Sequence, residues 1–126
     1  LQQKKPFSVK ERILSFKYAF NGLFLMLRNE HNAWIHCLAA AFAVTGGLLL
    51  EISKVEWLFV LGAIFLVFAL EMINTAIEHI CNAVTIEENP HIKKAKDVAA
   101  GAVLVGAAFA IVVASFIIYN HWGQMF

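Results

Sequence analysis

The stretch Glu71–Asp97, EMINTAIEHICNAVTIEENPHIKKAKD, decides how this chain folds and what chemistry it can perform. It begins inside one apolar run and ends where another apolar run begins. Glu71, Asn74 and Glu78 recur within it at helical spacing, and a seven-residue step returns to nearly the same side of a helix. The two carboxylates therefore share one helix face, with the carboxamide between them. Two acids and an amide at a membrane boundary indicate a metal site or a proton-handling site.

The composition of the 126-residue chain indicates an integral membrane protein. The chain is 60% hydrophobic and only 15% charged, with a mean hydropathy of +0.70. A soluble domain of this size has too little interior to hide that much apolar surface. The two cysteines, Cys37 and Cys81, show no metal-ligand spacing and are expected to be free thiols. No nucleic-acid partner is expected.

Uncharged runs predict three transmembrane helices, at about residues 31–50, 55–81 and 97–119. Before them, Ser8 opens a capping box with Glu11, and the apolar residues that follow keep to one stripe. This pattern predicts an amphipathic helix over about residues 8–28 on the membrane surface, and it equally allows a helix packed on other helices. We predict a single all-α membrane domain over residues 1–126.

The second span is the informative one. Its uncharged run, Trp57–Leu70, has only 14 residues, fewer than the ~20 that a helix needs to cross a bilayer. The helix must therefore continue through Glu71 to about Asn82. A carboxylate at that depth is costly, which makes Glu71 a functional candidate.

Two further features follow the second span. Asn82–Lys96 is expected to be a polar connection, with Asn89-Pro90 as a helix breaker. In the third span, small residues repeat every four positions and predict close helix packing along the stripe Ala102, Gly106, Ala110 and Ala114.

The basic residues predict the orientation. Six of the ten Lys and Arg residues precede the first span, one lies in the first loop and three lie in the second. The positive-inside rule then puts the N-terminus in the cytoplasm and the C-terminus outside. This topology brings a set of polar residues to the same cytoplasmic boundary: Glu30, Glu71, Asn74, Glu78, Lys96 and Asp97.

Such a set has what a Mg²⁺–nucleotide site needs. Mg²⁺ takes one or two protein carboxylates and completes its shell with phosphates and water, while a lysine supplies a charge for phosphate oxygens. A further, partly buried carboxylate could remove a proton from a hydroxyl. Each residue also has a plainer explanation: Lys96 and Asp97 as helix-end anchors, Glu78 as a snorkelling charge and Asn74 as an interhelical hydrogen bonder. The five histidines show no ligand spacing and are interpreted as structural or interfacial.

Two other classes of function stay open at this point. Glu71 could be the intramembrane site of a small ion or proton carrier, although acids at one boundary only disfavour that interpretation. The chain could also be a purely structural membrane protein. No Walker sequence or protein-kinase signature is present, so nucleotide chemistry here needs another scaffold.

Several motifs resemble those of the prokaryotic diacylglycerol kinase family, which includes undecaprenol kinases. They are Glu71-Met-Ile-Asn-Thr-Ala-Ile-Glu78, Ala95-Lys-Asp-Val-Ala-Ala-Gly-Ala-Val103, Ser15-Phe-Lys-Tyr-Ala-Phe-Asn-Gly22 and the pair Asn29-Glu30. The resemblance covers about residues 8–119. It implies a homotrimer of three-span protomers with surface helices in the bacterial inner membrane. It also implies Mg²⁺- and ATP-dependent phosphorylation of a lipid hydroxyl, with diacylglycerol as first acceptor and undecaprenol as second.

The resemblance also implies roles for individual residues. Glu71 would be the general base on the lipid hydroxyl, with Asn74 beside the reacting groups. Glu30 and Glu78 would hold Mg²⁺. The nucleotide would meet Lys96, Asp97, Asn82, Tyr18 and Arg12.

The chain departs from the family at two places. Asn82 stands where the family usually has Asp, and Ala33 and Trp34 replace an aromatic–arginine pair. These changes affect details of nucleotide or lipid binding rather than the reaction class.

Overall fold

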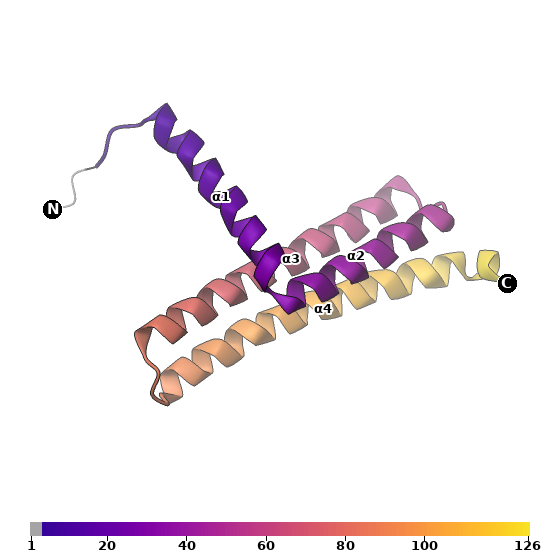
Figure 1. Cartoon of the computed structure of the whole chain (residues 1–126). Coiled ribbons are helices and arrows are strands. Elements are labelled where there is room, and N and C mark those ends of the chain that lie inside the picture. Colours follow the sequence, from indigo (N-terminus) through magenta and orange to yellow (C-terminus); the bar gives the residue numbers. More distant parts are fainter. Residues whose placement is uncertain (1–3) are drawn as a thin grey trace. The chain divides into compact units, whose positions relative to one another are not determined.

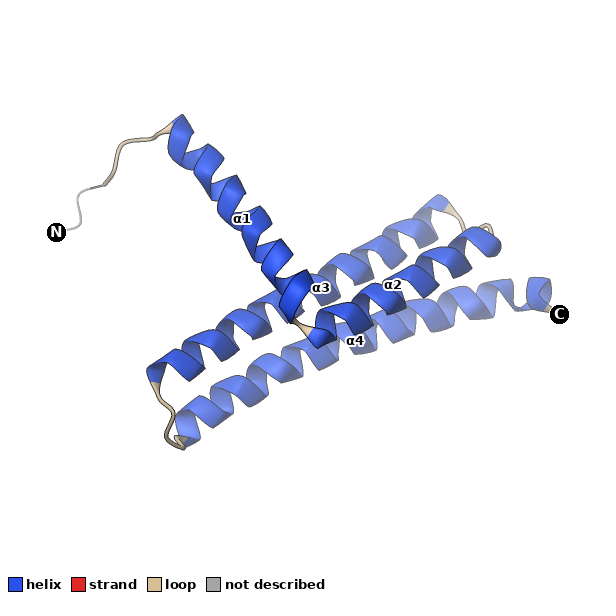
Figure 2. Cartoon of the chain, in the orientation of Figure 1, coloured by secondary structure: helices blue, strands red, loops and turns tan. Residues whose placement is uncertain are grey.

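A computed structural model describes residues 4–126, and the regular structure within them is helical (Figures 1 and 2). The four helices are α1 (Val9–Asn29), α2 (His31–Leu49), α3 (Lys54–Val84) and α4 (Pro90–Met125). The chain divides into two compact units, one ending at Glu30 and the other running from His31 to Phe126. The all-α prediction is confirmed.

The first unit consists mainly of α1. Its predicted N-cap is confirmed, since Ser8 Oγ accepts from the Glu11 N–H at 3.4 Å. The predicted apolar stripe, which includes Ile13, Phe16 and Phe20, is exposed along the helix. Contact of this stripe with a membrane surface remains a prediction.

The helices α2, α3 and α4 of the second unit are each long and apolar enough to cross a membrane. The predicted connection at Asn82–Lys96 is wrong in its length, because α3 continues to Val84 and α4 begins at Pro90. Pro90 starts a helix rather than breaking one: Asn89 is the N-cap, and its Oδ1 accepts from the His91 N–H at 2.9 Å. Proline suits this first position because its N–H has no intrahelical partner there. Hydropathy marks the bilayer, whereas the helices extend beyond the apolar runs.

Helices α3 and α4 pack against each other and form the main interface of the second unit. On α4 the buried residues Ala99, Gly106 and Val113 follow a seven-residue spacing, as in a heptad seam. The predicted four-residue stripe is therefore only partly right, because Ala102 and Ala114 are exposed while Gly106 is buried. A Cβ added at Gly106 would lie 2.7 Å from Leu70 Cδ1, which shows how closely the helices approach.

Large apolar side chains remain exposed on all three long helices. Phe42 on α2, Phe65 on α3 and Phe116 on α4 are each about two-thirds or more exposed. Phenylalanine is normally buried in a soluble protein, so these surfaces fit an apolar solvent or partner. Cys37 and Cys81 are free thiols, as predicted.

The turn between α2 and α3 is tight and contains a left-handed residue. Glu51 has φ +50°, and the Ile52 N–H donates to Gly47 O at 3.2 Å, which closes the end of α2. A Cβ added at Gly47 would lie 2.8 Å from Trp57 Cη2, so only glycine lets the indole pack there.

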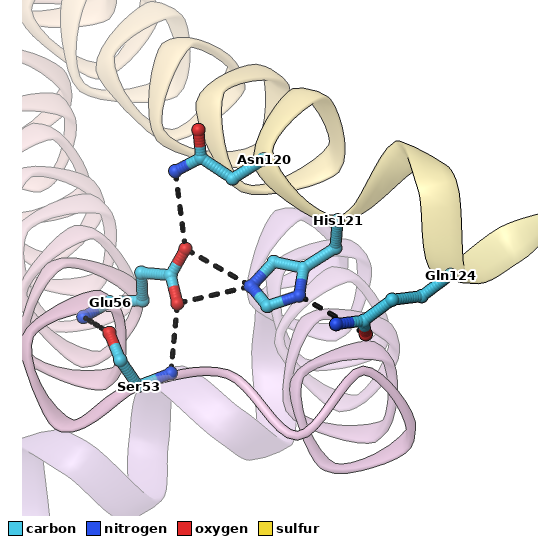
Figure 3. Close-up of polar contacts among 5 residues, drawn as sticks. All are labelled: Ser53, Glu56, Asn120, His121 and Gln124. Atoms are coloured by element: carbon cyan, nitrogen blue, oxygen red, sulfur yellow. Dashed lines mark hydrogen bonds and ion pairs between the residues drawn. The ribbon is translucent and has the colours of Figure 1, made fainter.

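A group of polar side chains, here called the Glu56 cluster, joins the start of α3 to the end of α4 (Figure 3). Ser53 and Glu56 form a complete capping box, with the Ser53 N–H donating to Glu56 Oε2 at 2.8 Å. His121 Nε2 lies 3.2 Å from both oxygens of the same carboxylate, and Asn120 Nδ2 donates to Oε1 at 3.4 Å. Gln124 Oε1 faces the other ring nitrogen at 3.3 Å. The cluster consists of Ser53, Glu56, Asn120, His121 and Gln124 (Figure 3). Each oxygen of the Glu56 carboxylate has two partners within it.

Candidate active site

Glu71 and Asn74 lie on the buried face of α3. The apolar residues Val60, Ala63 and Val67 occupy this face before them, and a step of three, four or seven residues keeps to one side of a helix. Glu71 is only 2% exposed and Asn74 only 6% exposed. The prediction that α3 continues through Glu71 is confirmed, and both polar residues occupy positions that a helix seam normally gives to apolar ones.

Two side chains of α2 contact the Glu71 carboxylate. Asn32 Nδ2 donates to Oε1 at 3.0 Å, and His36 Nε2 lies 3.6 Å from Oε2. The interpretation of His36 as merely structural or interfacial missed this contact, and Asn32 was not singled out at all. Their four-residue spacing, which places both on one face of a helix, was the available signal. We call Asn32, His36, Glu71 and Asn74 the Glu71 cluster.

Asn74 carries a polar atom that is out of place in an apolar seam. Its Oδ1 is buried and has no hydrogen-bond partner within residues 4–126. A buried carbonyl oxygen without a donor costs about 1–3 kcal/mol. Such an oxygen fits a ligand that supplies a donor or a positive charge, and hard oxygen atoms of this kind are what Mg²⁺ prefers. Glu78 follows one turn later on α3 and is half-buried.

Three of the residues predicted to bind nucleotide, Asn82, Lys96 and Asp97, lie where α3 ends and α4 begins. Lys96 Nζ donates to Asn82 Oδ1 at 3.3 Å, so two of them are brought together. Asp97, which is also predicted to meet the nucleotide, pairs with Lys93 at 2.7 Å. Lysine and aspartate four residues apart on a helix face each other, which explains this choice of partner.

These side chains line an open recess of about 810 Å³. Its walls also include Glu87 and Glu88 of the connecting loop. Asn82 lies eleven residues beyond Glu71 on α3, a rise of about 16 Å at 1.5 Å per residue. The Glu71 cluster, Glu78 and the recess therefore follow one another along α3.

The remaining predicted residues, Arg12, Tyr18 and Glu30, belong to the first unit. Arg12 and Tyr18 are exposed on α1, and Glu30 forms the C-cap of that helix, its N–H donating to Met26 O at 3.0 Å. Their approach to the residues of α3 remains a prediction.

No group of three or more His, Cys, Asp and Glu side chains within residues 4–126 could hold a metal ion by itself. This finding is compatible with Mg²⁺ bound together with a nucleotide, because the phosphates then supply several of the oxygen ligands. Glu78 and the unpartnered oxygen of Asn74 are suitable protein ligands in the second unit.

The sequence model of the family "Prokaryotic diacylglycerol kinase" matches residues 17–118 of this chain. The chain belongs to that family. It is similar to the undecaprenol kinase of Bacillus subtilis (strain 168), with 39% identity over 79% of this chain and 80% of that protein. It is also similar to the diacylglycerol kinase of Synechocystis sp. (33% identity; 80% of this chain, 58% of that protein). The diacylglycerol kinase of Helicobacter pylori is 31% identical over 82% of this chain and 86% of that protein.

Family membership makes the chain a lipid kinase, a transferase that uses ATP as its phosphate donor and a lipid as its acceptor. The prediction of an enzyme is thereby confirmed over the carrier and structural alternatives. Three apolar helices in a prokaryotic membrane kinase indicate a multi-pass protein of the inner membrane.

Proposed function

We propose that this lipid kinase transfers the γ-phosphoryl group of ATP to the hydroxyl of undecaprenol, with Glu71 as the general base. The observation that carries the proposal is a carboxylate only 2% exposed in a mainly apolar helix seam, beside an amide oxygen that has no partner among residues 4–126. Burial of such groups costs stability, and a protein that keeps them uses them.

The choice of acceptor rests on the relatives. The undecaprenol kinase of B. subtilis shares more identity with this chain than the diacylglycerol kinases of Synechocystis or H. pylori do. This reverses the order of acceptors predicted from the sequence, and diacylglycerol becomes the second candidate. Both acceptors present a hydroxyl on an apolar body, so the chemistry of transfer is the same.

In the proposed step, the lipid hydroxyl oxygen bonds to the γ-phosphorus while the bond from that phosphorus to the β,γ-bridging oxygen breaks. Glu71 accepts the hydroxyl proton, and ADP leaves. Most of the catalysis in phosphoryl transfer is positioning and charge neutralisation, so a small set of polar side chains suffices. Lys96 would contact the phosphates from the recess, with Asn82, Asp97, Tyr18 and Arg12 around the nucleotide.

Mg²⁺ would be held by Glu30 and Glu78, with Asn74 Oδ1 beside them. When bound, the ion neutralises charge on the phosphate oxygens. The half-buried position of Glu78, one turn from an oxygen that lacks a partner, supports this assignment.

The proposal includes the topology and the assembly. The excess of Lys and Arg before the first span supports a cytoplasmic N-terminus and an external C-terminus, so that ATP arrives from the cytoplasm. The family resemblance supports a homotrimer, and the exposed phenylalanines of the three spans are compatible with lipid or with neighbouring protomers around them.

Transfer of label from γ-labelled ATP by the purified protein tests the proposal. Undecaprenol and diacylglycerol are offered side by side in mixed micelles, with Mg²⁺ present. The expected result is labelled undecaprenyl phosphate formed with the higher kcat/KM. Labelling of diacylglycerol alone would overturn the acceptor, and labelling of neither lipid would overturn the proposed function.

A further inference from the structure

We propose that Asn32 and His36 of α2 are positioning residues for the reaction, holding the Glu71 carboxylate so that one defined oxygen receives the proton. The inference rests on the proposed function and adds two residues to it. It is carried by the contacts that these side chains make with the two carboxylate oxygens.

The contacts divide the carboxylate between two partners. Asn32 Nδ2 lies 3.0 Å from Oε1, within ordinary hydrogen-bond distance, and so satisfies that oxygen. His36 Nε2 lies 3.6 Å from Oε2, beyond the usual limit for a hydrogen bond. His36 therefore lies beside Oε2 without making a short hydrogen bond to it. Oε2 is the oxygen that remains able to accept a proton from the lipid hydroxyl.

The imidazole is itself held in place. Its ring meets Phe68 of α3 edge to face, with centroids 6.2 Å apart. Phe68 lies three residues before Glu71 on the same helix, so the aromatic contact and the carboxylate contact come from adjacent turns. The His36 side chain is 19% exposed, against 3% for Glu71, so the imidazole is the more accessible of the two groups.

His36 also forms the polar end of an apolar cavity of about 110 Å³ between the helices of the second unit. Ala40 of α2, Val67 of α3 and Ala110 of α4 also line this cavity. A protein that needed only packing at this place would find an apolar side chain cheaper than a ring nitrogen facing a carboxylate. The contact with Glu71, rather than the lining of the cavity, therefore explains why a histidine occupies this position.

A positioning role predicts losses in kcat rather than in KM for ATP. Removing residues that orient a reacting ligand in other proteins costs about 10–100-fold, and we expect losses of that order for Asn32→Ala and for His36→Ala. His36→Gln should recover most of the loss, because the Gln side-chain amide can put a nitrogen near the place of Nε2. Cys37→Ala, an exposed neighbour on α2, is the matched control and should keep the wild-type kcat.

The decisive readout is a double-mutant cycle with Glu71→Gln. If Asn32 and His36 act through Glu71, then Asn32→Ala and His36→Ala have no further effect on single-turnover transfer in the Glu71→Gln background. Equal losses in both backgrounds, together with lowered thermal stability, would show a structural role and overturn the inference. Wild-type kcat in both single variants would overturn it as well, while an active wild-type protein would leave the proposed function standing. A wild-type protein that labels no lipid would overturn the proposed function instead.

Discussion

Two glutamates of helix α3, Glu56 and Glu71, lie in opposite surroundings. Glu56, near its start, has each carboxylate oxygen paired, with partners from a capping box and from the end of α4 (Figure 3). Glu71 lies fifteen residues later, about 22 Å along the helix axis. It is more deeply buried, and Asn32 donates a hydrogen bond to only one of its two oxygens. Its neighbour Asn74 has an oxygen with no partner in the described chain.

This difference distinguishes a structural polar cluster from a functional one. A network whose members are all satisfied adds stability and orientation to the helices that it joins. A buried network with an unfilled position costs stability, and that cost is kept where a ligand or a transition state completes it. We therefore propose that the Glu56 cluster stabilises the fold and that the Glu71 cluster serves catalysis.

Chelation of Mg²⁺ is expected to have the largest effect. It should abolish the activity proposed for the Glu71 cluster and leave the stability given by the Glu56 cluster unchanged. Excess EDTA should abolish transfer of label from ATP, because the phosphate charge is then left without its counter-ion. Thermal stability of the nucleotide-free protein should not change, since the Glu56 cluster contains no metal. Transfer that persists in excess chelator would contradict the role given to Glu30 and Glu78.

Replacement of Asn74 by leucine should separate activity from stability. The change removes a buried oxygen without a partner, so we expect the protein to gain about 1 kcal/mol in stability. Transfer should fall by about 10–100-fold, as for other groups that support a reacting centre. The thermal midpoint in detergent and kcat, measured on the same preparation, check both effects. A loss of stability together with activity would mean that Asn74 is a structural hydrogen bonder.

The opposite outcome is expected for His121→Ala in the Glu56 cluster. Loss of the imidazole leaves the Glu56 carboxylate with fewer partners and should lower the thermal midpoint. The kcat and the KM for ATP should stay near the wild-type values, because the cluster lies far from Glu71. Gln124→Ala, which removes only the outermost partner, is the milder companion variant. A large fall in kcat at unchanged stability would contradict the structural assignment.

The smallest effect concerns the turn beside the Glu56 cluster. Glu51 is the one non-glycine residue with positive φ in the described chain, and such a conformation costs about 1 kcal/mol or more. Glu51→Gly should raise the thermal midpoint and leave transfer unchanged. A lowered midpoint would show that the Glu51 side chain makes a stabilising contact.

The sequence predicted the parts of this structure that depend on local pattern. Counting the short uncharged run before Glu71 placed that carboxylate on a continuing helix, and the helix is there. Hydropathy could not locate the helix ends, because α3 and α4 extend beyond the apolar runs through charged residues that still favour helix. The connection between α3 and α4 is therefore shorter than predicted and contains only the residues between Val84 and Pro90.

The contacts between distant residues were beyond the reach of local pattern. Asn32 and Glu71 are 39 positions apart, and Glu56 and His121 are 65 apart, so no periodicity connects them. The pairing of Asp97 with Lys93 was within reach, since four-residue spacing on a helix favours it. The family resemblance directed attention to Lys96 instead.

The central claim is that Glu71, and not Glu56, is the base. The direct test is transfer of label from γ-labelled ATP to undecaprenol by Glu71→Gln and by Glu56→Gln, purified and assayed together. Glu71→Gln should lose about 10²–10⁴-fold in kcat while remaining folded, the range that general-base catalysis contributes. Glu56→Gln should transfer at a rate near that of the wild type and unfold at a lower temperature. Wild-type transfer by Glu71→Gln would contradict the account.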